Sequence, residues 1–437
     1  MTEILKETRS RCPVCQASCP ATVRKVSGAP EKIHLFRTCP DHGTFDVCIS
    51  SDARFYWLSK GSGSCCGGGA CCAGDGGNDG TLGRNAEPGE ALGLQEKLST
   101  CLALIEIVDS CNLACPTCYA SSPHSADVKA ASLEDICARV QGVIDRKGKI
   151  EILQLSGGEP TLHPRFFDLL EWCQNHRSIE YVLLNTNGVR IAHDEEFARA
   201  LAERFRYGKF QLYLQFDGPQ EAGQRDLRGA DLRATRLRCL DRCAESDIPV
   251  TLAVTVTPEN LPYLWETVSF GLGRQNVRGV SFQPVFGSGR GTLGGGARVN
   301  TADIILNTVS QSAGRLRFED FTPLPCGDPN CATIGYLLRT PDGVRSVSDF
   351  LDFQSVQGFL RDRVRYSLED LVKCGCENEP LGAILKNFEI NERSAFRLFI
   401  KPFMDAWTWD EDRIDRCCTH VIRPDGKLDS FCRYYAG

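Results

Sequence analysis

The chain has 437 residues, 42% of them hydrophobic, and a formal net charge of −6 at pH 7. This length favours two or three domains, and the acidic balance gives no electrostatic reason to expect nucleic acid as a partner. No apolar run reaches the length of a membrane span, and residues 1–12 lack the apolar segment of a signal peptide. We therefore expect a soluble, cytoplasmic protein without an integral membrane segment.

Cysteine is unusually frequent, with 24 residues. In a long chain without an export signal, clustered cysteines favour metal binding over disulfides. Buried free thiols are the alternative, and they suit cysteines that stand singly or at helical spacing, namely Cys137, Cys173, Cys239 and Cys243. They do not suit the clusters described below.

Residues 1–60 are predicted to be a small metal-binding module. The segments "CPVC" and "CPDH" place four ligand side chains in two short pairs, Cys12 with Cys15 and Cys39 with His42. Three thiolates and one imidazole complete a tetrahedral site for zinc or mononuclear iron. Because all four positions are filled by protein, the site is expected to be structural.

Residues 61–100 are rich in glycine and cysteine and are predicted to be a loop or an auxiliary cluster segment. The proposed ligands of a first auxiliary [4Fe-4S] cluster are Cys66, Cys71, Cys72 and Cys101, and the adjacent Cys65 leaves the choice of thiols open. The alternative is a thiol-rich loop that binds a soft metal or none.

Residues 101–315 alternate between short apolar strands and amphipathic helices. Strands are predicted at 102–108, 150–155, 181–185, 211–216, 249–256 and 279–285, because these runs are apolar and rich in branched or aromatic residues. A helix is predicted after Ser132, with Asp135 close to a capping box. Six such units predict an α/β fold, a partial (β/α)6 barrel with its chemistry at the carboxyl ends of the strands.

The segment "CNLACPTCY" directly follows the first predicted strand and contains Cys111, Cys115 and Cys118. Three thiolates on a [4Fe-4S] cluster leave one iron open, and an open position indicates a reactive centre. A ligand with an amine and a carboxylate could chelate that iron. A zinc knuckle is the alternative interpretation of the triplet alone.

Polar residues end the following strands. "SGGEP" supplies Ser156, Gly157, Gly158 and Glu159, where the glycines allow close backbone approach to a ligand and the carboxylate could pair with an ammonium group. Further polar side chains at the strand ends are Asn185, Asn187, Gln215, Asp217 and Gln283. Each of these also suits an ordinary turn or cap.

Together, these motifs resemble the radical S-adenosylmethionine (radical SAM) superfamily. The resemblance implies that SAM binds the open iron, that the "GGE" segment holds its amino group, and that the later strand ends contact its ribose and carboxylate. It implies that Tyr119 packs against the adenine. It further implies a reductive cleavage to methionine and a 5'-deoxyadenosyl radical, with ferredoxin or flavodoxin as the electron donor.

Residues 316–437 are predicted to be an irregular, cysteine-rich domain. Their final segment resembles a subfamily that includes the archaeal tetraether lipid synthase and the pterin methylase of methanogens. The resemblance implies an auxiliary [4Fe-4S] site, here formed by Cys326, Cys331, Cys417 and Cys432, with Cys374 and Cys376 as substitutes.

The expected function is a radical SAM enzyme that alkylates or couples an unactivated carbon of a lipid-like or pterin-like substrate. The alternatives are group transfer or another radical reaction on a small molecule, and a non-enzymatic iron–sulfur or zinc sensor or scaffold. A long narrow channel would favour a lipid, and a compact polar pocket would favour a pterin-like ring.

Overall fold

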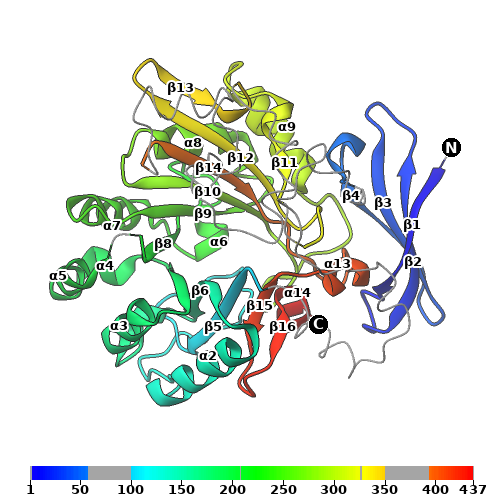
Figure 1. The fold of residues 1–437 in the computed structure, drawn as a ribbon. Coiled ribbons are helices and arrows are strands. Elements are labelled where there is room, and N and C mark those ends of the chain that lie inside the picture. Colours follow the sequence, from blue (N-terminus) through cyan, green and yellow to red (C-terminus); the bar gives the residue numbers. More distant parts are fainter. Residues whose placement is uncertain (1, 58–99, 207, 325–326, 350–392, 437) are drawn as a thin grey trace, which may run out of the picture.

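The computed structural model describes residues 2–57, 100–206, 208–324, 327–349 and 393–436. At the N-terminus, four strands form an antiparallel sheet in chain order (blue in Figure 1). They are β1 (Thr2–Arg11), β2 (Ser18–Val26), β3 (Lys32–Cys39) and β4 (Gly43–Ser50). Their apolar core is small, with Val23, Ile33 and Leu35 at its centre. A core of this size is the reason to expect that a metal stabilises the module.

A second sheet of 12 strands forms the body of the molecule. Its central part is six parallel strands that pair in chain order. They are β5 (Leu102–Val108), β6 (Ile150–Gly157), β7 (Ile179–Thr186), β8 (Phe210–Gln215), β9 (Val250–Val256) and β10 (Val277–Pro284). The six predicted strands are therefore confirmed, each within two residues of its expected bounds.

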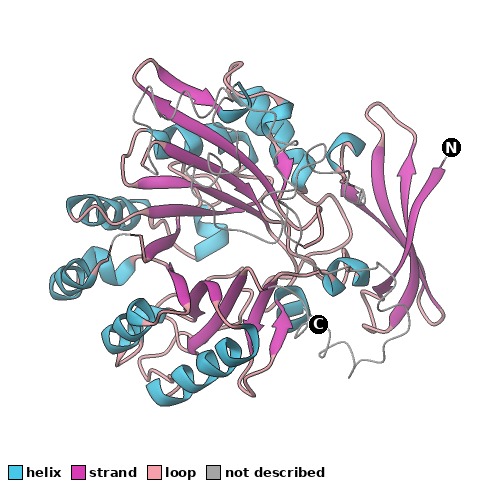
Figure 2. Ribbon diagram, in the orientation of Figure 1, coloured by secondary structure: helices cyan, strands magenta, loops and turns pink. Residues whose placement is uncertain are grey.

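Helices cover the outer face of this sheet, as Figure 2 shows. They are α2 (Leu133–Lys147), α3 (Phe166–Asn175), α4 (Val189–His193), α5 (Glu195–Arg204), α6 (Gln224–Arg228), α7 (Arg233–Glu245), α8 (Leu264–Leu272) and α9 (Thr301–Gln311). The first begins where the sequence predicts, because the Ser132 hydroxyl accepts a hydrogen bond from the Asp135 N–H at 3.1 Å. The main apolar core lies between these helices and the strands.

Residues after 316 do not form the irregular domain that the sequence predicts; their described parts extend the barrel sheet at both edges. Beside β10 lie β14 (Ala395–Ile400), β12 (Thr333–Thr340), β11 (Thr322–Pro323) and β13 (Gly343–Ser346), while β15 (Thr419–Ile422) and β16 (Leu428–Ser430) lie beside β5. Both β14 and β15 run parallel to the barrel strand that they pair with. The reason is that an edge strand offers unpaired N–H and C=O groups, which these distant segments satisfy.

Short helices complete the described chain. Two α-helices, α13 (Glu411–Asp415) and α14 (Phe431–Ala436), flank β15 and β16, and the 3₁₀ turns are η1 (Ala53–Phe55), η2 (Pro160–Leu162), η3 (Leu261–Tyr263), η4 (Phe318–Asp320) and η5 (Val347–Asp349).

The N-terminal sheet packs on the segment that leads into α13 (Figure 1). The Lys6 ammonium lies 2.7 Å from the Asp410 carboxylate, and the Arg11 guanidinium lies 3.8 Å from the ring centroid of Trp409. Arg37 is buried and donates a hydrogen bond to a backbone carbonyl of the same segment at 2.8 Å. The module therefore supports the chain immediately before Cys417.

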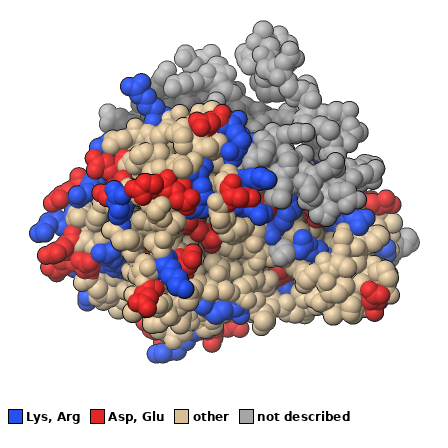
Figure 3. Space-filling model, turned by 90° about the horizontal axis from the view of Figure 1, so that it is seen from below, with Lys and Arg blue, Asp and Glu red and all other residues tan. Residues whose placement is uncertain are grey.

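Acidic and basic side chains are interspersed over the described part of the face in Figure 3. This mixture agrees with the small net charge of the chain and does not form the single-sign surface that nucleic-acid binding requires. Among the described residues, none of the helices is both long enough and apolar enough to span a bilayer.

Candidate active site and metal centres

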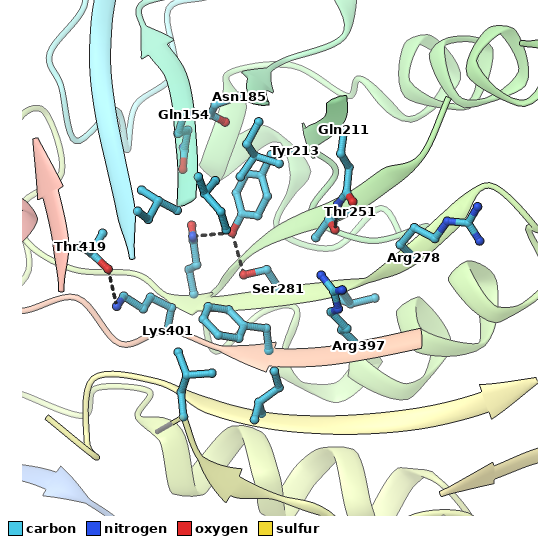
Figure 4. A pocket seen from close by; sticks show the side chains of 18 of the residues that line it. Gln154, Asn185, Gln211, Tyr213, Thr251, Arg278, Ser281, Arg397, Lys401 and Thr419 are labelled. Atoms are coloured by element: carbon cyan, nitrogen blue, oxygen red, sulfur yellow. Dashed lines mark hydrogen bonds between the residues drawn. The ribbon is translucent and has the colours of Figure 1, made fainter. Parts of the chain in front are cut away.

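A cavity of about 220 Å³ lies between β5–β10 and β14. Strand side chains alternate between the two faces of a sheet, and β8 presents Gln211, Tyr213 and Gln215 to the cavity. On β6 the corresponding residues are Ile152 and Gln154. The same alternation that buries Leu212 and Leu214 under the helices therefore lines the interior with polar groups (Figure 4).

Several of these polar groups bond to one another. The Gln283 amide donates to the Tyr213 hydroxyl at 2.7 Å, and that hydroxyl donates to the Ser281 hydroxyl at 2.6 Å. Burial raises the pKa of Tyr213, so the phenol stays protonated. Gln154 differs from them: its side chain is 9% exposed and has no hydrogen-bond partner among the described residues. Its amide is thus available to a molecule in the cavity.

The three-cysteine loop lies above the carboxyl end of β5. Arg290 holds it from outside, because its Nε donates to the Cys115 carbonyl at 2.9 Å and its backbone N–H donates to the Cys118 carbonyl at 3.0 Å. Burial raises the pKa of the Cys111 thiol to about 12, and the nearby charges of Cys115 and Cys118 contribute. The thiol of Cys111 therefore lies close enough to Cys115 and Cys118 to feel their charges.

The glycines of "SGGEP" fit a close approach to the chain that precedes this loop. A Cβ on Gly158 would lie 2.1 Å from the Ser110 carbonyl oxygen, and one on Gly157 would lie 2.2 Å from that of Val108. Their backbones are joined by a Gly158 N–H to Val108 O hydrogen bond of 2.7 Å. The glycines thus fix the end of β6 against the start of the cysteine loop, which is a role in the protein itself.

Glu159 is 1% exposed and is held entirely by protein groups. Its carboxylate accepts hydrogen bonds from the hydroxyls of Thr161 and Thr186, each at 2.7 Å, and from the Asn187 N–H at 2.8 Å. The Asn187 amide in turn donates to the side chain of Asn112 at 2.7 Å. The carboxylate therefore connects the ends of β6 and β7 to the cysteine loop, and its predicted contact with SAM stays a prediction.

Two other predicted contacts lie together on the cavity wall. Asn185 faces the cavity and donates to the Ser156 hydroxyl at 3.2 Å. Ser156 is 1% exposed. Both side chains are adjacent to Tyr119, and burial raises the pKa of this tyrosine to about 12.

Asp217 is buried and has a positive φ of 62°. Its carboxylate accepts two hydrogen bonds from Arg228, at 2.7 and 2.9 Å, and lies 3.2 Å from Arg236. Burial alone would lower the pKa of Arg228, but the charges of Asp217 and Cys115 outweigh it and raise that pKa. Arg228 is thus a cation held beside the cysteine loop, and sequence reasoning missed it because no motif distinguishes it from the surface arginines nearby.

Further cysteines gather where α13, β15 and α14 meet, and the described ones are Cys331, Cys417, Cys418 and Cys432. Burial raises the pKa of both Cys418 and Cys432 to about 11. The Arg413 guanidinium donates to the Cys331 sulfur at 3.8 Å. Of the residues predicted for this site, Cys326 and its substitutes Cys374 and Cys376 lie outside the described residues. Cys418, a cysteine of the same segment that was not in the predicted ligand set, lies within the group.

The predicted ligands of the N-terminal site come together. Their ligand atoms all lie within 4.8 Å of one another, in the group Cys12, Cys15, Cys39 and His42. The sulfurs of Cys15 and Cys39 are 3.8 Å apart, the edge of a tetrahedron with zinc–sulfur bonds of about 2.3 Å. The hydrogen bond from His42 is the main reason that the pKa of Cys39 falls to about 6. This geometry fits a single tetrahedral metal ion.

The first auxiliary site is less defined. Cys101 is fully buried directly before β5, and its sulfur is in a disulfide, a form that offers no thiolate to a cluster and so does not match its predicted role as a ligand. Its predicted partners Cys66, Cys71 and Cys72 lie outside the described residues, so this site stays a prediction.

Comparison with known proteins gives two matching families. The family model of the radical SAM superfamily matches residues 105–271, and that of the HMPTM N-terminal zinc ribbon domain matches residues 4–51. Residues 105–271 are a radical SAM domain. This domain contains β5 to α8 and carries the cysteine loop.

Curated relatives also match the chain. The 7,8-dihydro-6-hydroxymethylpterin dimethyltransferase of Methanocaldococcus jannaschii is 27% identical over 98% of this chain and 93% of its own. Mycofactocin maturase MftC of Mycobacterium ulcerans is 30% identical over 36% of this chain and 41% of its own. Among solved structures, Streptococcus suis SuiB bound to S-adenosylmethionine has a TM-score of 0.36 and 17% identity, covering 42% of this chain and 40% of that one.

Radical SAM enzymes use a [4Fe-4S] cluster and SAM, and the cysteine loop of this domain fits such a cluster. The charges of Cys115 and Cys118 disfavour the thiolate of Cys111, and a group of three neighbouring thiolates suits the positive charge that the iron ions of a cluster supply. The triplet does not meet the close spacing of the N-terminal group, and a cubane holds its sulfurs farther apart than one ion does. The donor set therefore suits a cluster with one iron open, as the sequence predicts.

Proposed function

We propose that this radical SAM enzyme transfers methyl groups to carbon atoms of a pterin-like ring. The observation that carries the proposal is the row of polar side chains on the cavity wall, above all Gln154, whose amide has no hydrogen-bond partner among the described residues. Pterin-like heterocycles present adjacent donors and acceptors along one edge, which a carboxamide can match in pairs. The full-length similarity to a protein named as a pterin dimethyltransferase supports the same substrate class.

The volume of the cavity supports a small substrate. About 220 Å³ is below the 300–1,000 Å³ that is typical of sites for drug-sized ligands. A single bicyclic ring matches this space better than a long chain does.

A lipid-like substrate is less consistent with the lining. Covering the amide of Gln154 with hydrocarbon would remove it from water without a new hydrogen bond, at a cost of about 1–3 kcal/mol. The apolar segment "FRLFIKPFMDAW", residues 396–407, could line a lipid channel, but its first part belongs to β14, in which Phe396, Leu398 and Ile400 belong to the main core. Only Phe399 of this strand adds an apolar ring to the cavity.

Different residues of the chain would have different roles in the reaction. Cys111, Cys115 and Cys118 would hold the cluster, whose chemistry when SAM is bound is a one-electron cleavage that makes an unreactive C–H bond accessible. Arg228, held by Asp217, brings a positive charge to the same loop. The polar side chains of the cavity wall would orient the ring. An external donor such as ferredoxin or flavodoxin would supply the electron.

The cysteine group beside β15 would hold an auxiliary [4Fe-4S] cluster. Cys331, Cys417 and Cys432 are the described members of the predicted ligand set. The fourth ligand would be Cys418 or Cys326. Cys418 lies in the group, and Cys326 lies five residues before Cys331 in the sequence.

The decisive experiment is an anaerobic assay of the reconstituted full chain with SAM, dithionite and 7,8-dihydro-6-hydroxymethylpterin. We expect the pterin to gain the mass of one or two methyl groups. A parallel reaction contains an isoprenoid phospholipid instead. Modification of the lipid and not of the pterin would overturn the proposal, as would SAM cleavage that neither substrate accelerates.

A substitution in the cavity tests the role of the lining. Gln154→Leu should raise the KM for the pterin by roughly 10-fold or more. This factor corresponds to the loss of about 1.5 kcal/mol of binding free energy when a hydrogen bond to a buried amide is removed. Cleavage of SAM without substrate should be unchanged. Gln220→Leu is the matched control, because this buried glutamine lies outside the cavity lining and bonds to the Asp217 carbonyl. Equal KM values for the wild type and Gln154→Leu would remove this residue from the substrate site.

A further inference from the structure

Lys401 occupies the wall between the substrate cavity and the auxiliary cysteine group. Its backbone N–H donates to the Phe282 carbonyl at 2.9 Å, which extends the pairing of β14 with β10 by one residue. Its ammonium donates to the Thr419 hydroxyl at 3.1 Å, and both residues line the cavity (Figure 4). Among the described residues, no carboxylate forms an ion pair with it.

The segment that follows Lys401 holds the cysteine group directly. The Met404 N–H donates to the Cys432 sulfur at 3.4 Å. The Pro402 carbonyl accepts a hydrogen bond from Arg413, and the same guanidinium nitrogen donates to the Cys331 sulfur. On the other side, Thr419 directly follows Cys418, a cysteine that also faces the cavity. Lys401 therefore starts the segment that contacts the thiols, and it donates a hydrogen bond to the first residue of β15, which directly follows Cys417 and Cys418.

The negative charge of the cysteine group favours a cation in the wall between this group and the cavity. Lys401 is partly buried; desolvation disfavours its ammonium form, and the charges of Cys331, Cys418, Cys417 and Cys432 favour it. A cubane bound by four thiolates carries net negative charge, and burying it without opposite charge is costly. Arg413 supplies one cation on the side of α13, and Lys401 supplies another on the side of the cavity.

Resting on the auxiliary cluster of the proposed function, we propose that Lys401 is the cavity-facing counter-cation of that cluster and raises its reduction potential. Net charge and hydrogen bonding around the sulfurs are main determinants of such potentials. A positive charge favours the reduced cluster, which is more negative by one electron. Lys401 is thus a positioning residue: it sets how readily the auxiliary cluster accepts an electron from the donor, next to the space that the substrate fills.

The test is a redox titration followed by electron paramagnetic resonance. All proteins carry Cys111→Ala, Cys115→Ala and Cys118→Ala, so that the radical SAM cluster is absent, and the signal that is lost when Cys432→Ala is added is assigned to the auxiliary cluster beside Lys401. Lys401→Gln should make the midpoint potential more negative by about 59 mV, a tenfold change in the reduction equilibrium of a one-electron couple. Lys401→Arg keeps the charge and should stay close to the parent. Lys149→Gln is the matched control at an exposed lysine at the start of β6, which pairs with Glu180.

The outcomes separate this inference from the function on which it rests. If the triple variant retains no iron–sulfur cluster, the auxiliary site is wrong. If the cluster is present but Lys401→Gln and Lys149→Gln have the same potential, the counter-cation role is wrong and the site stands. If Lys401→Gln loses its iron, retention of iron by Lys401→Arg supports the role, and loss of iron from Lys401→Arg as well overturns it.

Discussion

The rings of Tyr119 and Tyr435 meet edge to face with their centroids 4.8 Å apart. The first follows the last cysteine of the radical SAM loop, and the second belongs to α14, which also carries Cys432. The Ser288 hydroxyl lies against the backbone carbonyls of both tyrosines. Because of this contact, the C-terminal helix is part of the wall of the radical SAM site, and the two cysteine groups share one packed support.

Replacing Tyr435 should therefore loosen a cluster to which it contributes no ligand. Tyr435→Ala removes the ring contact, worth about 0.5–1.5 kcal/mol beyond the buried area, and the hydroxyl that donates to Glu106 at 2.7 Å. We expect a lower melting temperature and faster loss of cluster iron to a chelator. Tyr435→Phe keeps the ring and should retain most of the iron. Equal iron loss from the two variants would mean that the hydrogen bond, and not the ring, supports the loop.

The cysteine triplet gives the most direct test of the radical SAM reaction. Three thiolates are the minimum set for a cluster with an open iron, so Cys115→Ala should abolish 5'-deoxyadenosine formation from SAM and dithionite. Iron bound at the C-terminal group should remain, because its ligands come from other elements. Cys137→Ala is the control, a helical cysteine of α2 outside all the groups. Wild-type production of 5'-deoxyadenosine by Cys115→Ala would contradict the assignment of the loop.

Glu159 offers a test between a ligand contact and a support role. Its carboxylate accepts hydrogen bonds from Thr161, Thr186 and Asn187 inside the protein. Glu159→Gln places an amide donor among these donors, which we expect to lower the free energy of unfolding by about 1–3 kcal/mol. If the residue only supports the loop, SAM should bind the folded variant with nearly normal affinity in equilibrium dialysis. A loss of SAM affinity without a loss of stability would instead favour the predicted contact with the ammonium group of SAM.

The parts of the fold that sequence predicts are those set by local pattern. Branched apolar runs indicate strands wherever they occur, and the four N-terminal ligands come from two short pairs whose spacing alone defines the site. The pairing of β14 with β10 was missed because its partner lies more than a hundred residues away. Pairing at a sheet edge depends on which backbone groups the rest of the fold leaves open, and no local pattern records that.

The charged groups of the site were missed for a related reason. Arg228 and Lys401 have ordinary neighbours in sequence, and such residues are mostly exposed. Only the fold places one beside Cys115 and the other beside the C-terminal thiols. The hydrogen bonds of Glu159 could not be predicted either. Its partners Thr161 and Thr186 follow two different strands, and they reach the same carboxylate only because the ends of these strands are adjacent in the fold.

The N-terminal ligands should bind a metal that stabilises the module independently of the reaction. Cys39→Ala removes one of four ligands, so we expect the loss of one equivalent of zinc or iron by elemental analysis and a lower solubility. The [4Fe-4S] absorbance per folded chain should be unchanged. Cys48→Ala is the control, since burial raises the pKa of this thiol to about 11 and it lies outside the four-ligand group. An unchanged metal content in Cys39→Ala would refute the site.

Asp217 and Arg228 form a buried ion pair, and Arg228 lies beside Cys115 of the cysteine loop. Burial alone would raise the pKa of Asp217, but Arg228 and Arg236 lower it below its ordinary value. The charged carboxylate therefore stabilises the folded state at pH values above the ordinary aspartate pKa, and this contribution is lost as the pH falls through the lowered pKa. At pH 7, Asp217→Asn should reduce the free energy of unfolding by about 3–5 kcal/mol, because two guanidinium groups remain buried without their counter-charge.

The difference in the free energy of unfolding between the wild type and Asp217→Asn should disappear at acidic pH. Urea unfolding at pH 7 and at successively lower pH should show the gap between wild type and Asp217→Asn closing below the ordinary aspartate pKa of about 3.9. Asp231→Asn is the matched control at a partly exposed pair with Arg233, where we expect a change of at most about 1 kcal/mol. Because Arg228 then loses its fixed position beside Cys115, Asp217→Asn should also form less 5'-deoxyadenosine at pH 7 per folded, cluster-loaded chain. A gap that stayed constant with pH, or normal SAM cleavage by this variant, would show that Asp217 does not position Arg228 through its charge.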